Sequence, residues 1–263
     1  MKPDYKNWVP KGMLLGVMAG TAAAGVLLLA FLMSDLFSGT TRTVVSVILT
    51  AAFLILLVTS ILCVIWYRTF SYDGPRQFSR QVIQRIAAYI DLPQGGKGLD
   101  VGCGSGALTI ACAKRNPDAA MLGVDRWGRE YAAFTQPLCQ SNAKIEGVSD
   151  NTSFQQADAC HLPFGDGAFD AVTSNYCYHN IPSRNRQAIV LETLRVLKKG
   201  GTFAIHDIFS RGKYGDTKKL LQTLRDKGYE KVELLDTTNG LFMTKKECRT
   251  LMLYGSALLV GKK

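Results

Sequence analysis

Two runs of apolar residues, 12–33 and 43–67, constrain this chain of 263 residues more than any other feature. Neither run contains a charged side chain, and each is longer than twenty residues. At about 1.5 Å per residue, a helix of that length crosses a hydrocarbon layer of about 30 Å. The sequence therefore predicts two transmembrane helices within a membrane anchor that comprises residues 1–69.

Three other interpretations of the two runs fit the sequence less well. A cleaved signal peptide has a shorter apolar core with a small-residue cleavage site after it, whereas here a second apolar run follows a short link. Helices in the core of a soluble protein, and helices that lie on a membrane surface, usually have a polar face. Neither run has such a face, so the sequence favours two spans.

Charges beside the two runs predict the orientation of the anchor. Three lysines, at positions 2, 6 and 11, precede the first run and Arg68 follows the second, whereas the link between the runs holds only Asp35 and Arg42. Basic residues close to membrane spans stay on the cytoplasmic side. We therefore expect a multi-pass protein of the cell membrane whose N-terminus and large C-terminal part are cytoplasmic.

The first run also contains a stripe of small residues. Gly12, Gly16, Gly20 and Ala24 recur every fourth position, so they share one helix face and allow a second helix to approach closely. The expected partner of this stripe is the second span, which would make a helical hairpin. Dimerisation through the same stripe is the alternative.

Charge and cysteine content bound the remaining classes. The chain has 31 basic and 21 acidic residues, a net charge of +10, and most of this excess lies beyond residue 75. Such an excess suits nucleic acid, but it equally suits the anionic inner leaflet beside a tethered domain. The densest basic segment, 213–231, is either a solvated helix face or a lipid contact. Seven cysteines without a C-x-x-C pair predict reduced thiols rather than a zinc cage or a disulfide framework.

Residues 70–96 are expected to be a neck and a leading amphipathic helix, because Asp73-Gly74-Pro75 breaks the second apolar helix and apolar residues between 78 and 90 recur at helical spacing. From residue 97, short apolar strands alternate with helical segments, which predicts a parallel sheet with helices on both faces. The expected strands are 97–101, 120–124, 152–156, 169–174, 201–207, 230–236 and 255–262. The expected helices are about 106–115, 128–143, 184–197 and 215–228, with a further helix start near Thr244.

A glycine-rich stretch, DVGCGSG at 100–106, follows the first of these strands and precedes a helix. Glycines there let a ligand approach the backbone and tolerate positive φ. The spacing differs from the dinucleotide fingerprint G-x-G-x-x-G, because the third glycine comes one residue early. The stretch resembles the first motif of class I S-adenosylmethionine-dependent methyltransferases, in which an acidic residue precedes alternate glycines.

The chain beyond this motif resembles that family in order and spacing from about residue 76 to 263. The matching segments are GVD at 123–125, QADA at 156–159 followed by LPF at 162–164, FDAV at 169–172, LKKGGTF at 197–203, and a final pair of strands. The segment 158–164 and the turn YHNI at 178–181 are most similar to the ubiquinone and menaquinone C-methyltransferases. The resemblance implies an α/β, Rossmann-like fold of seven strands with the last strand reversed, formed by residues 97–263.

The resemblance also implies S-adenosyl-L-methionine as cofactor and a set of residues that would bind it. Asp125 would accept both ribose hydroxyls, which suits the two oxygens of a carboxylate, and Asp158 would accept from the adenine amine. Without the resemblance, Asp125 is read as a cap of the next helix and Asp158 as a cap of a turn. The full cofactor-binding set is Asp100, Gly102, Cys103, Gly104, Gly106, Asp125, Arg126, Asp158, Ala159 and Asn175.

The acceptor is expected beyond the fourth and fifth strands, where His179 and His206 follow their strand ends. Histidine exchanges a proton near neutral pH, so His179 is the preferred base or acceptor-orienting residue and His206 the second candidate. Either could instead be a hydrogen-bonded structural histidine. His206-Asp207 resembles a metal-binding pair of catechol methyltransferases, but the further ligands are not evident, so no metal is expected.

Together these features predict a membrane-anchored methyltransferase that acts on a small lipophilic acceptor. The acceptor classes are a quinone precursor, a lipid head group, and a hydrophobic thiol or phenol. One alternative is a membrane module that binds the cofactor without catalysis. The other is a protein or nucleic-acid methyltransferase. The positive charge suits a nucleic-acid substrate, but the sequence lacks the acceptor motif N-P-P-Y or D-P-P-Y, so nucleic acid is not expected as a partner.

Overall fold

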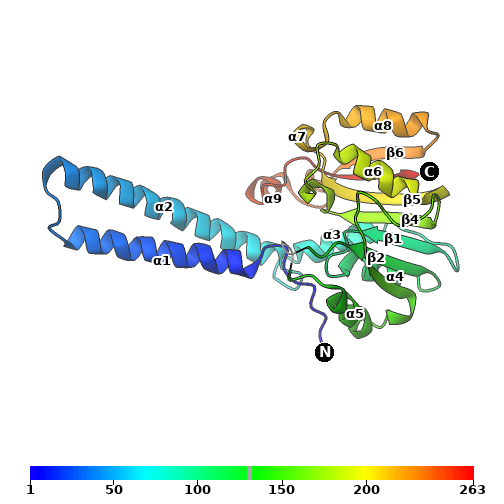
Figure 1. The fold of residues 1–263 in the computed structure, drawn as a ribbon, viewed down its shortest axis with the longest axis horizontal. Helices are drawn as coiled ribbons and strands as arrows, with labels where there is room; N and C mark the ends of the chain where they lie inside the picture. The colour runs from blue at the N-terminus through cyan, green and yellow to red at the C-terminus, as the bar shows by residue number, and fades with distance from the viewer. Residues whose placement is uncertain (129–131) are drawn as a thin grey trace. The chain divides into compact units, whose positions relative to one another are not determined.

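The computed structural model describes residues 1–128 and 132–263 (Figure 1). The chain forms two compact units, of which one is Asn7–Ser79 and the other combines Met1–Lys6 with Arg80–Lys263. The first unit contains the apolar helices, and the second contains the sheet. We describe each unit by itself, and call the second the sheet domain.

Two long helices, α1 (Lys11–Met33) and α2 (Gly39–Phe70), pack along each other as a hairpin. Both are long and apolar enough to cross a membrane. Only 6% and 11% of the residues in their most apolar stretches are buried, whereas the core helix of a soluble protein would be mostly buried. The two predicted helices are confirmed, and their apolar surfaces face outward.

The hairpin is not joined through the predicted glycine stripe. A Cβ atom added to Gly12, Gly16 or Gly20 would meet no atom of the described residues within 4 Å, so these glycines do not face α2. The contact uses the neighbouring face of α1, where Thr21 Oγ1 lies 2.8 Å from Ser60 Oγ in a buried polar pair. The expectation that the stripe meets the second span was wrong, because spacing identifies which residues share a face and not which face meets the partner. Dimerisation through the stripe stays a prediction.

The sheet domain is built on seven strands in the order β3-β2-β1-β4-β5-β7-β6. The strands are β1 (Lys97–Val101), β2 (Ala120–Asp125), β3 (Thr152–Gln156), β4 (Phe169–Asn175), β5 (Leu197–Ile208), β6 (Glu230–Asp236) and β7 (Ser256–Lys262). The first five pair in parallel, whereas β7 lies antiparallel between β5 and β6. The predicted Rossmann-like, seven-stranded fold with a reversed last strand is confirmed.

Each of four helices packs against strands that are near it in the sequence: α4 against β1 and β2, α5 against β3, α6 against β5 and α8 against β6. Fully buried apolar side chains, including Leu99, Val172 and Phe203, form the core between these layers. The helices are α3 (Phe78–Ala87), α4 (Ala107–Arg115), α5 (Gln136–Ile145), α6 (Arg186–Arg195), α7 (Arg211–Tyr214), α8 (Thr217–Asp226) and α9 (Lys245–Thr250), with the short 3-10 turns η2 (Ser149–Asn151) and η3 (Tyr178–Asn180).

The helix expected from about residue 128 begins later, as α5. Thr135 caps it by accepting a hydrogen bond from Leu138 N at 3.3 Å, and Pro137 stands in its first turn, where its missing N–H costs nothing. Residues 129–131, which fall within the expected helix, lie outside the described residues. The helix start near Thr244 is confirmed as a capping box, in which Thr244 and Glu247 bond reciprocally at the start of α9.

Candidate active site

The candidate site lies where β1 and β4 neighbour each other, because β2 and β3 extend the sheet from β1 on one side and β5 extends it from β4 on the other. In open α/β sheets, ligands bind beyond the carboxyl ends of the strands at this reversal point. The loop after β1, the turn after β4 and the end of β5 all lie at those strand ends. The predicted cofactor and acceptor residues therefore come from adjacent strands.

Positive backbone angles shape the loop after β1, with φ of +76° at Gly102, +56° at Gly104 and +80° at Gly106. A Cβ on Gly102 would stand 2.2 Å from Cys177 Sγ, and one on Gly106 would stand 3.0 Å from the ring of Phe154. These two glycines are required by the protein's own packing. Within residues 1–128 and 132–263, a Cβ on Gly104 would meet only one atom, at 3.9 Å, so these residues leave the backbone open at that glycine.

Asp125, at the end of β2, braces this loop. Its carboxylate accepts hydrogen bonds from Gly104 N at 2.9 Å and from Trp127 N at 2.8 Å, and Trp127 Nε1 donates to Gly104 O at 3.0 Å. Thr135 caps the following helix, so the capping alternative for Asp125 does not hold. Because each carboxylate oxygen accepts more than one donor, Asp125 retains acceptor capacity for the two ribose hydroxyls of a nucleoside.

Asp100 is buried beneath the same loop with half of its carboxyl group unpaired. Thr109 Oγ1 donates to Oδ2 at 2.7 Å, whereas Oδ1 has no hydrogen-bond partner among residues 1–128 and 132–263. Burial raises the pKa of Asp100 to about 7. An unpaired buried carboxyl oxygen is costly unless a donor arrives, and a cationic amine such as the α-ammonium group of S-adenosylmethionine is a donor that fits.

The other predicted cofactor residues lie on loops around the site. Asp158 is exposed and accepts from Cys160 N at 2.8 Å, which is the turn-capping geometry that the sequence left open. Arg126 is exposed, and its carbonyl accepts from Gln156 Nε2 at 3.0 Å. Ala159 is half-buried in the same turn as Asp158. Cys103 is buried in the glycine loop, and its N–H donates to Val124 O at 3.0 Å.

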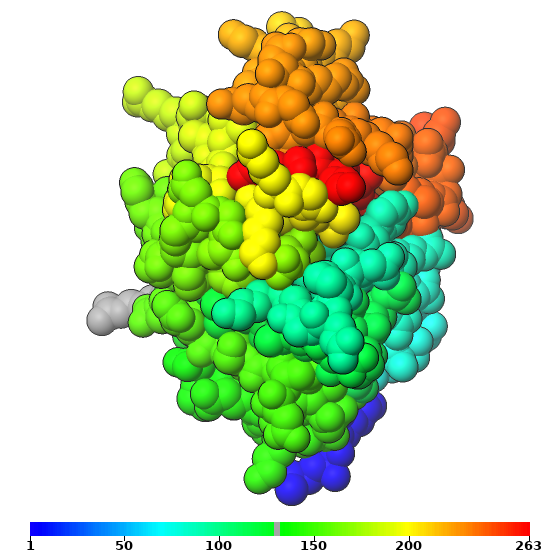
Figure 2. Space-filling model, turned by 90° about the vertical axis from the view of Figure 1, so that its right-hand side faces the viewer, coloured from blue at the N-terminus to red at the C-terminus, as the bar shows by residue number. Residues whose placement is uncertain are grey.

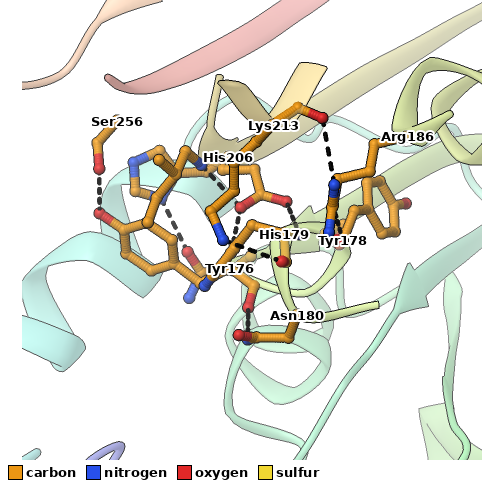
Figure 3. A network of polar contacts seen from close by, with 12 residues as sticks. Tyr176, Tyr178, His179, Asn180, Arg186, His206, Lys213 and Ser256 are labelled. Carbon is orange, nitrogen blue, oxygen red and sulfur yellow. Dashed lines mark hydrogen bonds and ion pairs between the residues drawn. The ribbon is translucent and has the colours of Figure 1, made fainter. Parts of the chain in front are cut away.

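His179 lies on η3, just after β4 (Figure 3). Asp207, at the end of β5, holds it. Asp207 accepts from the backbone N–H of His179 at 2.9 Å and is paired with ring atom Nδ1 through its other oxygen. Asp207 is fully buried, whereas the side chain of His179 is 15% exposed. The carboxylate fixes a proton on Nδ1, so Nε2 keeps its lone pair as an acceptor.

Two further donors complete the shell of Asp207. Tyr214 OH donates to Oδ2 at 2.7 Å and Ile208 N donates to Oδ1 at 2.7 Å. Burial alone would raise the pKa of Asp207, but the hydrogen bonds from His179, Tyr214 and Ile208 hold that pKa below its ordinary value. Asp207 is therefore a stable anion against the histidine ring. From the sequence, Asp207 was expected beside the acceptor region after the fifth strand, with metal binding as its one possible role.

His206 has a different environment from His179. It is fully buried, with Nδ1 at 2.9 Å from Asn175 Oδ1 and Nε2 at 3.2 Å from Thr237 Oγ1. Burial lowers the pKa of His206 to about 3, so its ring stays neutral. Both ring nitrogens have hydrogen-bond partners, so neither is available to take a proton from an acceptor. This geometry matches the structural-histidine alternative, and it commits the predicted cofactor residue Asn175 to a hydrogen bond with His206.

Tyr176 lies between the two histidine rings in an unusual backbone conformation, with φ of +49°. Its ring centroid is 4.4 Å from that of His206 and 5.8 Å from that of His179, and its hydroxyl is 2.8 Å from Ser256 Oγ (Figure 3). A non-glycine residue with positive φ costs free energy and often marks a functional site.

In the part of the chain that the structure describes, no three His, Cys, Asp or Glu residues are grouped so that they could hold a metal ion.

Comparison with known proteins agrees with this geometry. Residues 99–205 match the family model described as a methyltransferase domain. This chain carries a class I S-adenosylmethionine-dependent methyltransferase domain. The cofactor of the methyltransferase domain is S-adenosyl-L-methionine, as the sequence predicted. The match covers the glycine loop, Asp125, Asp158 and the turn that carries His179.

Known methyltransferases are similar to this domain in sequence. Methyltransferase GfsG of Streptomyces halstedii is 30% identical over 151 residues, 57% of this chain and 51% of that protein. A demethylmenaquinone methyltransferase of Lactobacillus johnsonii is 35% identical over 115 residues, 42% of this chain and 43% of that protein. The chain thus spans about half the length of the curated relatives it matches.

Among solved structures, geranyl diphosphate C-methyltransferase from Streptomyces coelicolor A3(2) has a TM-score of 0.56 and 14% identity to this chain. The likeness covers 74% of this chain and 80% of that one. At this identity the comparison shows the shared fold of the methyltransferase domain.

Proposed function

We propose that this chain is a membrane-anchored S-adenosylmethionine-dependent methyltransferase that methylates a small lipophilic acceptor, with His179 as general base. The observation that carries the proposal is the pair of His179 and the buried Asp207 beside the glycine loop. When bound, the cofactor supplies a methyl group on a sulfonium centre. Because the methyl group is already activated, the protein's tasks are to position the acceptor and to take its proton.

The glycine loop, Asp100, Asp125 and Asp158 are the residues that we propose hold the cofactor. Three observations support this proposal. Asp100 has an unpaired buried oxygen, the backbone is open at Gly104, and Asp125 has spare lone pairs that can accept from a ligand. Arg126 and Ala159 border the same loops. Asn175 has a weaker claim, because its side-chain oxygen is taken by His206.

His179 would take the proton of the acceptor on Nε2. Asp207 holds Nδ1, and the negative charge of Asp207 stabilises the imidazolium that forms. This arrangement favours acceptors that carry a removable proton, which include a phenol or quinol, a thiol, an acidic carbon of a quinone precursor, and the amine of a lipid head group. His206 is not proposed as a base. Burial disfavours its protonated form, and both of its ring nitrogens already have hydrogen-bond partners.

The apolar hairpin supports a lipophilic acceptor. Two membrane spans would account for its outward apolar surface, and the charge distribution supports a cytoplasmic methyltransferase domain. A domain tethered to a bilayer meets lipid-dissolved molecules at high effective concentration. The demethylmenaquinone methyltransferases among the relatives are named for a quinone acceptor.

The experiment that tests the proposal compares lipid extracts of three strains: with the gene, without it, and with a His179→Ala allele. We expect at least one lipid-soluble species to be heavier by one methyl group only when the wild-type gene is present. The His179→Ala strain should resemble the deletion. Identical extracts from all three strains, with methylated protein or RNA appearing instead, would overturn the lipophilic acceptor.

A further inference from the structure

We propose that the first six residues of the chain form a strap that positions the cofactor loop through Asn142, so that cofactor binding depends on a segment outside the methyltransferase family match. The proposal concerns Met1–Lys6, which pack with the sheet domain although they precede α1. It rests on the proposed function only where the glycine loop is taken as the cofactor loop.

Asn142 on α5 holds the strap by both ends of its amide. Its Oδ1 accepts from Asp4 N at 2.8 Å, and its Nδ2 donates to Asp4 O at 2.9 Å. The same Nδ2 donates its second proton to Ser105 O, in the middle of the glycine loop, at 3.0 Å. Asn142 is 1% exposed, so one buried amide links the N-terminal backbone to the cofactor loop.

The strap helps to fix the orientation of the side-chain amide of Asn142. If the amide of Asn142 were turned over, its oxygen would oppose the carbonyl oxygens of Ser105 and Asp4, and its NH2 group would oppose Asp4 N–H. Pairing with both backbone groups of Asp4 therefore selects the orientation that donates to Ser105. Without the strap, only the carbonyl of Ser105 still favours this orientation, and the buried amide loses two partners.

A second contact from α5 shows that this helix holds the loop. Cys139 lies one turn before Asn142 on the same face of α5, and its Sγ donates to Gly104 O at 3.2 Å. Two consecutive carbonyls of the glycine loop, those of Gly104 and Ser105, are thus bound by α5 side chains. Movement of α5 or of Asn142 would be felt at the position where the cofactor approaches the backbone.

The strap is anchored independently at Tyr5. This side chain is 5% exposed, and its hydroxyl donates to Glu146 Oε1 at 2.9 Å. The other oxygen of Glu146 is paired with Lys114 Nζ on α4. Figure 2 shows the first residues of the chain, in dark blue, against the green surface of the sheet domain. A change at Tyr5 removes the bond to Glu146 and leaves every atom of Asn142 and of the glycine loop in place, so it tests the strap.

The test uses the full chain in lipid nanodiscs without cofactor, with hydrogen exchange of residues 102–106 as the readout. Tyr5→Ser should release the strap, and Asn142→Leu should cut the link. In both we expect loop exchange to be faster by about five-fold or more, as loss of one or two hydrogen bonds predicts. Binding of S-adenosylhomocysteine should weaken by a similar factor.

Two controls make the outcome specific. Tyr254→Ser changes an exposed tyrosine, and Asn151→Leu removes an amide that donates to Ala113 O and Ala119 O, two carbonyls away from the loop. Neither should alter exchange at 102–106. If Tyr5→Ser remains folded with wild-type loop exchange, the strap proposal is overturned while the proposed function stands. If the loop loosens as expected but the wild-type chain binds no cofactor, the proposed function fails and the strap remains.

Discussion

Replacement of Asp207 by asparagine is the sharpest perturbation of the candidate site. The carboxylate accepts four hydrogen bonds, two on each oxygen: His179 Nδ1 and Ile208 N on Oδ1, and His179 N and Tyr214 OH on Oδ2. An asparagine retains one oxygen and places an NH2 group where the other stood. The substitution conserves shape, so its effects report on charge and hydrogen bonding.

Either orientation of the new amide damages the site. If NH2 faces the ring, His179 must accept on Nδ1 and carry its proton on Nε2, where it can no longer act as a base. If NH2 faces the backbone N–H of His179, two donors oppose each other. Loss of two charge-assisted hydrogen bonds should cost about 2–5 kcal/mol of unfolding free energy. Loss of general-base catalysis should lower the methylation rate about 10²- to 10⁴-fold.

Two assays separate these effects. Nitrogen NMR of the histidine rings reports the tautomer of His179 without an acceptor, and methyl transfer from labelled cofactor into membrane lipid extract reports the rate. Asp170→Asn is the control, because Asp170 is a paired carboxylate at the opposite end of β4. It accepts hydrogen bonds from Lys198 Nζ at 2.7 Å and from Lys97 N at 2.8 Å. A variant at Asp207 that retains the wild-type tautomer and the wild-type rate would refute the reasoning.

Three other outcomes are expected. Gly102→Ala should lose about 2–4 kcal/mol of stability in thermal unfolding and lose cofactor binding, because its Cβ would stand 2.2 Å from Cys177 Sγ at a φ of +76°; normal binding by a folded variant would contradict this. The raised pKa of Asp100 means that its contribution to stability is full below 3.8 and is lost as pH rises through about 7. Cofactor affinity should rise over the same window, with proton release in calorimetry at pH 6, whereas affinity independent of pH would exclude Asp100 as the amine's partner. Thr21→Val should destabilise the hairpin by about 0.6–1.7 kcal/mol in a bilayer unfolding assay, because it removes the hydroxyl that meets Ser60; an unchanged hairpin would show that the pair is dispensable.

Local pattern predicted most of the fold. All seven strands and the glycine turn follow from short apolar runs and turn residues within a few positions of one another, whereas the reversal of β7 was implied by the family resemblance. The start of α5 was misplaced because the apolar pattern gave no weight to the cap at Thr135 and to Pro137, which set the boundary. The face of α1 that meets α2 depends on tertiary packing, which spacing alone does not encode.

The candidate site was predicted less completely than the fold. The sequence placed His179 and His206 near the acceptor but could not rank their environments, because burial is not visible in a motif. His206 and Asp207 are adjacent on a strand, so their side chains point to opposite faces, and only Asp207 reaches His179. The link from Asp4 to Asn142 joins residues 138 positions apart, and no local signal could reveal it.

The central claim is methyl transfer from the cofactor to a lipophilic acceptor at His179. The most direct measurement incubates the full chain in nanodiscs of membrane lipid extract with methyl-labelled S-adenosylmethionine and then separates organic from aqueous phases. We expect label in the organic phase for the wild-type chain and its near absence for Asp207→Asn. Label that stays with water-soluble molecules, or equal organic label for both chains, would contradict it.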